Sequence, residues 1–296
     1  MKFGIVGNLS KETLSDAVLR LWHAGEKRPL DFVVEEELAK LINKEHGSKI
    51  IPKKQTAEMD ELVSQCDMVI AFGGDGTMLS AARLVGRASV PIVGVNLGKL
   101  GFLAEVSVDE IESFVDDILN NQHLIEDRMV VKLTADDEEE PLFGLNDIVI
   151  DKSGSSRMLS VETHVDNDYL VSYTGDGVIV STPTGTTGYA LAAGGPIVVP
   201  LSEVLTISPI CPHMLTARSV IVPDSSIIKI TIRSQSEKVR VTADGQSERT
   251  FTSPIQLQVQ KADYTVKLVK RKDRSYYDVL RTKLMWGRDI RVQKNA

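Results

Sequence analysis

The first 124 residues alternate between short apolar runs and segments in which apolar residues recur every three or four positions. Short apolar runs are typical of buried β-strands, and the longer spacing is typical of amphipathic helices. Strands are predicted at residues 2–6, 49–51, 67–72 and 90–95, and helices at residues 10–23, 35–45, 78–85 and 109–119. Because strands that alternate with helices favour a parallel sheet covered by helices, this part is predicted to be a Rossmann-like α/β domain.

From about residue 126 the pattern changes to many short segments in which every second residue is apolar. Such segments, separated by turn residues, indicate an all-β sandwich. The strands are predicted at residues 130–133, 147–150, 158–165, 169–173, 178–180, 220–222, 227–232, 239–242, 255–259 and 265–269. Residues 275–286 return to helical spacing and are expected to pack back on the first domain. The predicted domains are therefore 1–124, 125–270 and 271–296.

The composition is that of an ordinary globular protein, with 296 residues of which 25% are charged and 42% are hydrophobic. Asp and Glu outnumber Lys and Arg by 41 to 34, and the net charge of −7 disfavours general adhesion to nucleic acid or to an anionic membrane. Cys66 and Cys211 have neither the spacing of a zinc site nor that of a disulfide framework. No apolar run approaches the roughly 20 residues that cross a bilayer. We therefore predict a cytoplasmic protein with no nucleic-acid or membrane partner.

The sharpest local motif is Gly73-Gly74-Asp75-Gly76-Thr77, between a predicted buried strand and a predicted helix. A glycine-rich turn at a helix N-terminus presents backbone N–H groups to a phosphate, and the glycines let the ligand approach closely. A carboxylate at such a turn repels a phosphate unless it meets a hydroxyl group or a metal ion. Asp75 is therefore a candidate for chemistry, and the alternative is that it only caps the following helix.

A second glycine-rich region, residues 175–195, contains six glycines and a run of hydroxyl residues. Its serine and threonine side chains, together with Tyr189, suit a sugar, an amide or a nucleotide base. Within this region, Asp176-Gly177 could instead be an ordinary hairpin turn. Asp244-Gly245-Gln246 could likewise be the tip of a hairpin, and Asn146-Asp147 could form a local Asx turn.

Several well-known motifs are absent from the sequence. There is no Gly-x-x-x-x-Gly-Lys-Ser/Thr, since Gly98-Lys99 is followed by Leu100, and there is no Gly-x-Gly-x-x-Gly. The protein-kinase catalytic loop, Gly-x-Ser-x-Gly and His-Glu-x-x-His are missing as well. A P-loop NTPase is therefore excluded, a standard Rossmann dinucleotide site is unsupported, and nucleotide binding requires another design.

Six motifs occur in an order that resembles the NAD kinase family. They are GGDGT at 73–77, NLGKLGFL at 96–103, LND at 145–147, GDG at 175–177, TPTGTTGYALAAGGPI at 182–197 and DGQ at 244–246. The resemblance implies an α/β N-terminal domain, a β-sandwich C-terminal domain and an active site in the crevice between them. It also implies phosphorylation of the 2′-hydroxyl of the adenosine ribose of NAD to give NADP. The implied donor is ATP or polyphosphate, with a divalent metal, Mg²⁺, bound mainly through the ATP phosphates.

The resemblance also assigns roles to individual residues. Asp75 matches the family's proposed general base, and Asn146 with Asp147 matches the pair that grips a ribose of NAD. The implied NAD contacts are Asp75, Gly76, Phe102, Asn146, Asp147, Arg157, Thr174, Asp176, Thr187, Gly188, Tyr189, Ala190, Leu191, Ala192 and Gln246. The turn residues Gly73, Gly74, Gly76 and Thr77 are expected to bind phosphate, and no residue is assigned as a metal ligand.

The sequence departs from the family pattern at three positions. Asp147 stands where Glu is more usual, which shortens the reach to a ribose by one methylene. Thr186 replaces the commoner Ser, and Gly188 replaces the commoner Ala. These changes bear on affinity and on the choice between NAD and NADH rather than on the chemistry.

We predict that Asp75 orients the attacking hydroxyl more than it deprotonates it. Phosphoryl transfer passes through a loose transition state in which little charge builds up on the nucleophile. Two alternative functions are a lipid kinase of the same superfamily and a module that binds the dinucleotide without turnover. Members of the family are usually dimers or tetramers, so a homodimer or homotetramer is expected.

Overall fold

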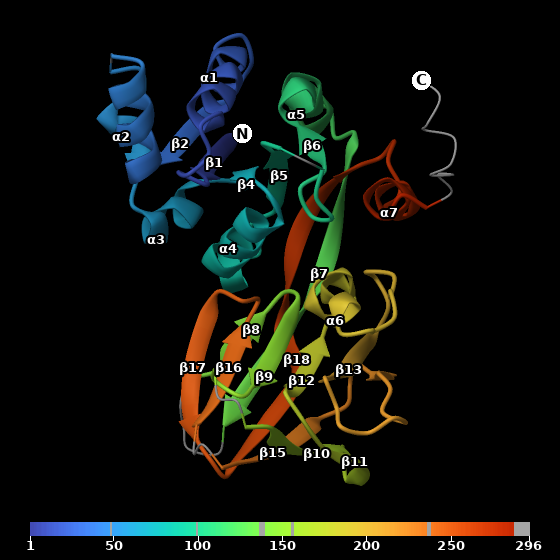
Figure 1. The fold of residues 1–296 in the computed structure, drawn as a ribbon. Coiled ribbons are helices and arrows are strands. Elements are labelled where there is room, and N and C mark those ends of the chain that lie inside the picture. The colour runs from blue at the N-terminus through green and yellow to red at the C-terminus, as the bar shows by residue number, and fades with distance from the viewer. Residues whose placement is uncertain (48, 99, 136–139, 155–156, 236–237, 287–296) are drawn as a thin grey trace, which may run out of the picture. The chain divides into compact units, whose positions relative to one another are not determined.

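The computed structural model describes residues 1–47, 49–98, 100–135, 140–154, 157–235 and 238–286, and the chain divides into two compact units (Figure 1). Unit 1 comprises Met1–Glu126 and Lys267–Ala296, and unit 2 comprises Asp127–Val266. The strands β7 (His123–Ala135) and β18 (Ile255–Arg271) each run from one unit into the other. Among the described helices, none combines the length and the apolar character that a membrane span requires.

Unit 1 contains a parallel sheet in the order β18-β5-β4-β1-β2-β3, with the short strand β6 beside β5. Its other strands are β1 (Lys2–Gly7), β2 (Asp31–Glu35), β3 (Thr56–Ala57), β4 (Met68–Gly73), β5 (Ile92–Asn96) and β6 (Val106–Ser107). The order β3-β2-β1-β4-β5 is that of a doubly wound Rossmann-like sheet. The predicted α/β class of this part of the chain is confirmed.

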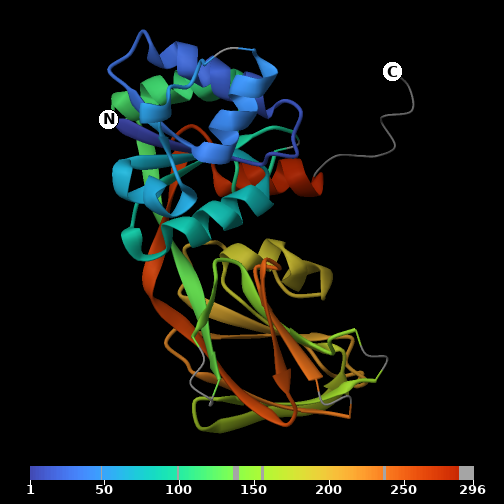
Figure 2. The ribbon, with the colours of Figure 1, turned by 90° about the vertical axis from the view of Figure 1, so that its left-hand side faces the viewer.

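Helices cover both faces of this sheet. They are α1 (Leu14–Gly25), α2 (Glu36–Glu45), α3 (Met59–Leu62), α4 (Asp75–Val85), α5 (Ile111–Leu119) and α7 (Tyr276–Leu284). α1, α2 and α5 share a core with Phe3 and Phe72. On the other face α4 packs so closely that a Cβ at Gly94 would lie 2.7 Å from the Met78 sulfur. Figure 2 shows α1 and α5 on one side of the sheet and α4 on the other.

The strand predicted at residues 49–51 is wrong, and an amide side chain explains why. The Asn43 Nδ2 group donates to the carbonyl of Ile51, and the Ile51 N–H donates to Asn43 Oδ1, both at 3.0 Å. These two bonds use the backbone groups that a strand would pair in a ladder. The edge strand is β3, beside β2, and the apolar pattern misses both.

Unit 2 consists of two antiparallel sheets around one core. One sheet has the order β14-β13-β12-β9-β16-β17, and the other contains β11, β10, β15 and β18, with β7 and β8. Alternate residues of both sheets, such as Ile148 and Val178 from the first and Val161 and Leu257 from the second, fill the core. The remaining strands are β8 (Leu142–Gly144), β9 (Asp147–Asp151), β10 (Leu159–Val165), β11 (Asp168–Gly175), β12 (Gly177–Ser181), β13 (Val204–Ile210), β14 (Val220–Pro223), β15 (Ile228–Ser234), β16 (Lys238–Ala243) and β17 (Ser247–Thr252).

The predicted β-sandwich is therefore confirmed, with two differences in its strands. The segments predicted as separate strands at 255–259 and 265–269 form the single strand β18, and Ala262, between them, is buried as well. Three strands, β8, β13 and β17, are not predicted by the pattern, although β13 pairs with β12, β17 with β16 and β8 with β7.

Candidate functional site

The glycine-rich turn of unit 1 joins β4 to α4, as predicted. Gly74 is the N-cap residue of α4 and Asp75 is its first residue. The turn is tight, since a Cβ at Gly73 would lie 2.1 Å from Thr77 Oγ1, whereas Gly74 and Gly76 have nothing within 4 Å of the place where a Cβ would stand. A glycine-rich turn with space beside two of its Cα atoms, at the N-terminus of an eleven-residue helix, is an arrangement suited to phosphate.

The Asp75 carboxylate does not cap α4. Its oxygens accept the N–H groups of three consecutive residues, at 2.9 Å from Phe102, 3.0 Å from Leu103 and 3.4 Å from Ala104. Gly101 makes this approach possible, because a Cβ there would lie 2.0 Å from Asp75 Oδ1. The alternative that Asp75 only caps the helix is therefore wrong. Asp75 Oδ2 accepts one of the three bonds, which leaves it a lone pair for a hydroxyl group.

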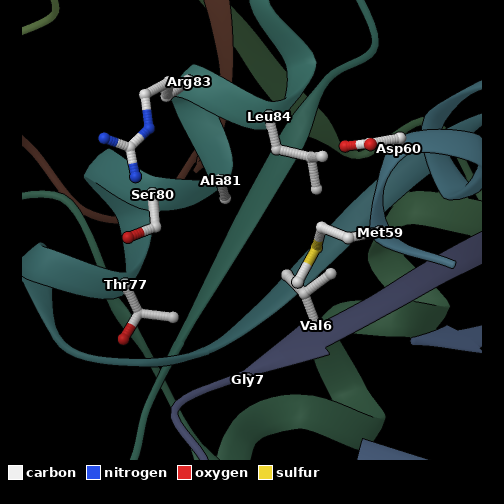
Figure 3. A pocket seen from close by; sticks show the side chains of 9 residues that line it. All are labelled: Val6, Gly7, Met59, Asp60, Thr77, Ser80, Ala81, Arg83 and Leu84. Atoms are coloured by element: carbon white, nitrogen blue, oxygen red, sulfur yellow. The ribbon is translucent and has the colours of Figure 1, made fainter. Parts of the chain in front are cut away.

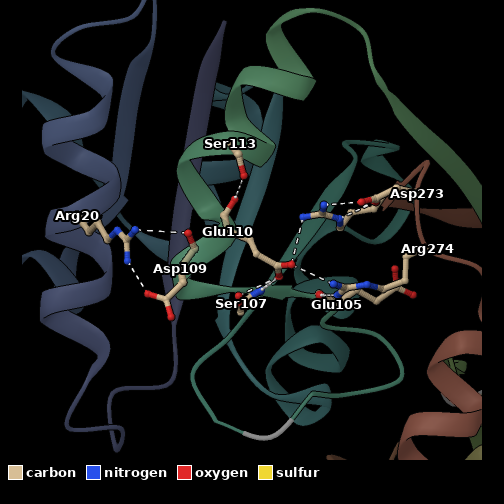
Figure 4. A network of polar contacts seen from close by, with 9 residues as sticks. Arg20, Glu105, Ser107, Asp109, Glu110, Ser113, Asp273 and Arg274 are labelled. Atoms are coloured by element: carbon tan, nitrogen blue, oxygen red, sulfur yellow. Dashed lines mark hydrogen bonds and ion pairs between the residues drawn. The ribbon is translucent and has the colours of Figure 1, made fainter.

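The loop that carries Phe102 is fixed by the C-terminal segment of unit 1. Lys283 of α7 places its ammonium group 5.5 Å from the centre of the Phe102 ring. Glu105 forms an ion pair with Lys270, and both side chains are only 7% exposed. Arg274 Nη1 donates to the Glu105 carbonyl at 2.6 Å, within the polar network that Figure 4 shows. The loop whose N–H groups bond to Asp75 is therefore held by the C-terminal segment of unit 1.

A hollow of about 440 Å³ lies beside α4 in unit 1 (Figure 3). Thr77, Ser80 and Leu84 follow one another at helical spacing, so one face of α4 lines it. This hollow combines hydroxyl and guanidinium groups from α4 with apolar side chains from β1 and α3. Its lining residues are Val6, Gly7, Met59, Asp60, Thr77, Ser80, Ala81, Arg83 and Leu84. A hollow of this kind, next to a glycine-rich turn at a helix N-terminus, is suited to a nucleotide base or sugar.

The pair Asn146-Asp147 lies in unit 2, where β9 begins. Asp147 is 5% exposed, and burial, with a smaller effect of the nearby Asp244 carboxylate, raises the pKa of Asp147 to about 7. Asn146 Oδ1 is buried and accepts no hydrogen bond from any described residue. An Asx turn would engage this oxygen, so that alternative is wrong. Since buried polar atoms almost always have a partner, the arrangement leaves an acceptor for a ligand.

A second hollow, of about 450 Å³, opens beside this pair in unit 2. Tyr189, which is 48% exposed, brings an aromatic ring to it. Arg240 and Asp151 form a bidentate ion pair in its wall, at 2.9 and 2.7 Å. Its lining residues are Asn146, Asp147, Val149, Asp151, Tyr189, Arg240, Thr242, Asp244, Gly245 and Glu248. The hollow therefore offers an aromatic face, an amide and carboxylates, which suits a ribose with a neighbouring base.

The hydroxyl-rich segment forms a short 3₁₀ helix (Thr184–Thr187) and then α6 (Tyr189–Ala192). Thr182, just before it, donates its hydroxyl to the Leu145 carbonyl at 2.6 Å. Gly185 packs directly against the backbone of Asn146, because a Cβ at position 185 would lie 2.0 Å from the Asn146 carbonyl oxygen. Thr182 and Gly185 therefore hold the backbone of the Asn146 segment. Among the NAD contacts predicted in residues 187–192, Tyr189 lines the hollow.

Two of the departures from the family pattern have clear surroundings here. Thr186 is fully buried and its hydroxyl donates to the Pro183 carbonyl at 2.7 Å, so it serves the segment's own structure. A Cβ at Gly188 would lie 3.6 Å from Asn146 Nδ2 and 3.9 Å from Asp147 Oδ2. Glycine at this position therefore leaves extra space beside the two polar side chains.

Asp176-Gly177 is not a hairpin turn. β11, which ends before it, pairs with β10, whereas β12, which follows it, pairs with β9 and β13 in the other sheet. The chain therefore crosses from one sheet to the other here, and that alternative is wrong. Asp176 forms an ion pair with Lys152 at 2.8 Å.

The other predicted contacts lie at different places. Gln246 is in the hairpin that joins β16 to β17, as predicted for the Asp-Gly sequence before it. Arg157 donates to Gln235 at 3.4 Å, and Thr174 lines a separate hollow with Arg233. Neither Arg157 nor Thr174 is among the described residues that line the second hollow.

Sequence reasoning missed several residues that line this hollow, among them Asp151, Arg240 and Asp244, and Asp244 has the most contacts with the Asn146 segment. Its carboxylate accepts the backbone N–H groups of Leu145, Asn146 and Asp147. The DGQ motif contained the signal, since an Asp before Gly at a hairpin tip often bonds to nearby backbone. Only Gln246 was assigned from that motif.

Comparisons with known proteins agree with the motifs. The family model of the ATP-NAD kinase N-terminal domain matches residues 3–123, and that of the C-terminal domain matches residues 145–271. An NAD kinase from Bacteroides fragilis is 39% identical over 294 residues, covering 99% of this chain and 100% of the relative. One from Geobacter sulfurreducens is 40% identical over 265 residues, covering 88% of this chain and 90% of the relative.

Two solved structures share the fold. The crystal structure of yeast NADH kinase complexed with NADH superposes with a TM-score of 0.87 at 25% identity, covering 99% of this chain and 90% of that one. The NAD kinase from Archaeoglobus fulgidus in complex with ATP superposes with a TM-score of 0.76 at 23% identity, covering 96% of this chain and 99% of that one.

Proposed function

Because the chain belongs to the NAD kinase family and is a phosphotransferase that acts on NAD with ATP, we propose that unit 1 binds the donor, unit 2 binds NAD, and Asp75 orients the hydroxyl that is phosphorylated. The observation that carries this proposal is the Asp75 carboxylate, which lies within the glycine-rich turn and keeps an oxygen lone pair for a hydroxyl. The curated relatives named here are NAD kinases, which favours this reaction over lipid phosphorylation and over binding without turnover.

The donor is proposed to bind at α4. Its phosphates would lie on the turn Gly73, Gly74, Gly76 and Thr77, where the helix N-terminus attracts negative charge. Its adenosine part would enter the hollow beside α4, with the apolar side chains Val6, Met59 and Leu84 against the base (Figure 3). The neighbouring Thr77, Ser80 and Arg83 supply polar groups on the same side of α4.

Positioning is proposed as the main role of Asp75. Three N–H groups already bond to its carboxylate, so little of its acceptor capacity remains to take a proton early in the reaction. The 2′-hydroxyl would donate to Oδ2 and be held in line with the γ-phosphorus of ATP. As the new P–O bond forms and the bond to the β-phosphate oxygen breaks, the hydroxyl proton passes to Oδ2. A loose transition state needs no earlier proton transfer.

NAD is proposed to bind in the hollow of unit 2. Asn146 Oδ1 and the Asp147 carboxylate are acceptors suited to ribose hydroxyls, and the Tyr189 ring is suited to stacking on a base. Asp176, Gln246 and Phe102 stay predicted contacts from the family resemblance. The same holds for Arg157 and Thr174, which lie elsewhere in unit 2. The predicted crevice concerns how the two units are placed and also stays a prediction.

ATP is proposed to enter as its complex with a divalent cation, Mg²⁺, bound mainly through the phosphate oxygens. Within the part of the chain that the structure describes, no group of three or more His, Cys, Asp or Glu side chains could hold a metal. The Asp75 carboxylate beside the turn is already engaged by N–H groups. Coordination chiefly by phosphate therefore suits these residues, and the cation would neutralise charge on the transferred group.

A homodimer or homotetramer built through unit 2 is proposed from the family resemblance. Unit 2 exposes large apolar side chains, with Leu215 at 96%, Leu201 at 60% and Ile221 at 49%. Exposed apolar side chains of this size are the kind of surface that a second copy covers. Light scattering at micromolar protein would detect the oligomer, and a monomeric mass would contradict it. The cytoplasmic location also stays a prediction, with Cys66 and Cys211 as free thiols.

The test incubates the purified protein with NAD, ATP and Mg²⁺ and measures NADP with an NADP-specific dehydrogenase. We expect NADP to form, and Asp75→Asn to lower kcat by at least about 100-fold. Asp67→Asn is the matched control, because Asp67 is an exposed carboxylate of the same unit that also accepts a backbone N–H, from Lys2 at 2.7 Å. A folded Asp75→Asn protein with near-full turnover would exclude the proposed role. Parallel reactions with polyphosphate, and with a chelator, report the donor and the metal requirement.

A further inference from the structure

One carboxylate organises the backbone under the NAD hollow of unit 2. Asp244 Oδ2 accepts the Leu145 N–H at 2.8 Å, and Oδ1 accepts the N–H groups of Asn146 at 2.7 Å and Asp147 at 3.2 Å. In return, the Asp244 N–H donates to the Asp147 carbonyl at 3.0 Å. Four hydrogen bonds therefore connect a single residue of the β16–β17 hairpin to three residues that are 97 to 99 positions away in the sequence.

The hairpin turn is shaped for this contact. Asp244 and Gly245 both have positive φ, +55° and +64°, as in a tight hairpin turn, and from this turn the Asp244 carboxylate bonds to the start of the neighbouring strand β9. Gly144 leaves the necessary room, because a Cβ there would lie 3.1 Å from Asp244 Oδ1 and 2.6 Å from the Asp147 carbonyl oxygen. A side chain at position 144 would therefore push the carboxylate and the segment apart.

The opposite side of the segment is fixed as well. The Thr182 hydroxyl donates to the Leu145 carbonyl at 2.6 Å, and the Thr182 N–H donates to the Asn146 carbonyl at 2.9 Å. N–H groups held by Asp244 and carbonyls held by Thr182 leave the backbone of Asn146 and Asp147 one conformation. In that conformation Asn146 Oδ1 is buried with no hydrogen-bond partner among the described residues, and the Asp147 carboxylate lines the hollow.

We propose that Asp244 is a positioning residue for NAD: it fixes the segment 145–147 so that Asn146 and Asp147 meet the ribose hydroxyls without further ordering. The inference rests on the proposed placement of NAD in this hollow. Holding polar groups in their binding geometry before the ligand arrives lowers the entropic cost of binding, so the effect falls on NAD affinity. The donor side of the reaction lies in unit 1 and gains nothing directly from Asp244.

Another hairpin in unit 2 provides a matched control. Asp166 also has positive φ, +56°, and its carboxylate accepts the Ile227 N–H at 2.9 Å while its own N–H donates to the Ile227 carbonyl at 2.8 Å. Asp166 thus ties a hairpin to a neighbouring strand in the same manner, but the residues it holds do not line the NAD hollow. A role in hairpin stability alone would make the two aspartates equivalent.

The experiment compares Asp244→Asn with Asp166→Asn in steady-state NAD kinase assays, with NAD and ATP varied in turn. The Asn amide turns an NH₂ group toward backbone N–H donors, so we expect the KM for NAD to rise by about tenfold while the KM for ATP changes by less than about twofold. Asp166→Asn should leave both KM values within about twofold of the original. If Asp244→Asn does not accumulate as folded protein, Asp244→Glu keeps both oxygens, moves them by one methylene and should show the same split.

Three results would overturn the inference. They are an unchanged KM for NAD in folded Asp244 variants, equal rises in the KM for NAD and for ATP, or a rise as large in Asp166→Asn. Asn146→Ala separates this from failure of the proposed function. If Asn146→Ala leaves the KM for NAD unchanged, NAD does not bind in this hollow and both ideas fall. If it raises that KM and Asp244→Asn does not, only the role of Asp244 is refuted.

Discussion

Replacing Asp147 by asparagine should make the free energy of unfolding less dependent on pH. Burial and the neighbouring Asp244 carboxylate raise the pKa of Asp147 from 3.8 to about 7 in the folded protein. The folded state therefore binds this proton more tightly than the unfolded chain does. The resulting contribution to stability is fully present below pH 3.8 and is lost as the pH rises through 7.

The magnitude follows from the width of this pH window. One pKa unit corresponds to about 1.4 kcal/mol. The carboxyl is already ionised in the unfolded chain at pH 5, whereas in the folded protein it gives up its proton around pH 7, so the original protein should lose about 2.6 kcal/mol between pH 5 and pH 8. Little further loss from Asp147 is expected above pH 8. The asparagine amide does not titrate and lacks this loss.

Urea unfolding followed by far-UV circular dichroism, at pH 5 and at pH 8, tests the prediction. Both proteins share all other titratable groups, so the difference between their pH dependences isolates Asp147, and it should be about 2–3 kcal/mol. Asp168→Asn, at an exposed position of the same unit, controls for a general effect of changing a carboxylate to an amide. Parallel pH dependences, within about 0.5 kcal/mol, would refute the reasoning.

Two further predictions concern unit 1. Gly101→Ala places a Cβ 2.0 Å from Asp75 Oδ1, so it should move this carboxylate and lower kcat in the NADP assay by at least about tenfold. Gly98→Ala is the control, because its Cβ would have only one contact, at 3.9 Å, and kcat should not change; equal kcat values for the two variants would contradict the role of Asp75. Lys270→Met should lower the free energy of unfolding by about 3–5 kcal/mol, because it leaves the Glu105 carboxylate buried without its ion-pair partner. Adding Glu105→Leu should recover most of this loss, and a double variant no more stable than the single one would contradict the prediction.

Short-range patterns in the sequence predicted the fold class and the positions of the main motifs. The buried run before Gly73 predicted β4, and the helical spacing after Thr77 predicted α4, because these signals come from residues within a few positions of one another. The order of the motifs was sufficient to identify the family, and the family models match the same parts of the chain. Where a single side chain competed for the backbone, as Asn43 does at Ile51, the same patterns predicted a strand that does not form.

The partners of the site carboxylates were decided by the tertiary structure alone. Asp75 bonds to backbone 27 to 29 residues away and Asp244 to backbone 97 to 99 residues away, so neither contact leaves a periodic signal in the sequence. Both depend on where two loops are brought by the packing of separate strands. Locally, Asp75 suits a helix cap and Asn146 an Asx turn, because the competing long-range hydrogen bonds exist only once the sheets have formed. The sequence therefore determined the motifs around which the site is built, and the folded chain determined which other residues join them and which hold them in place.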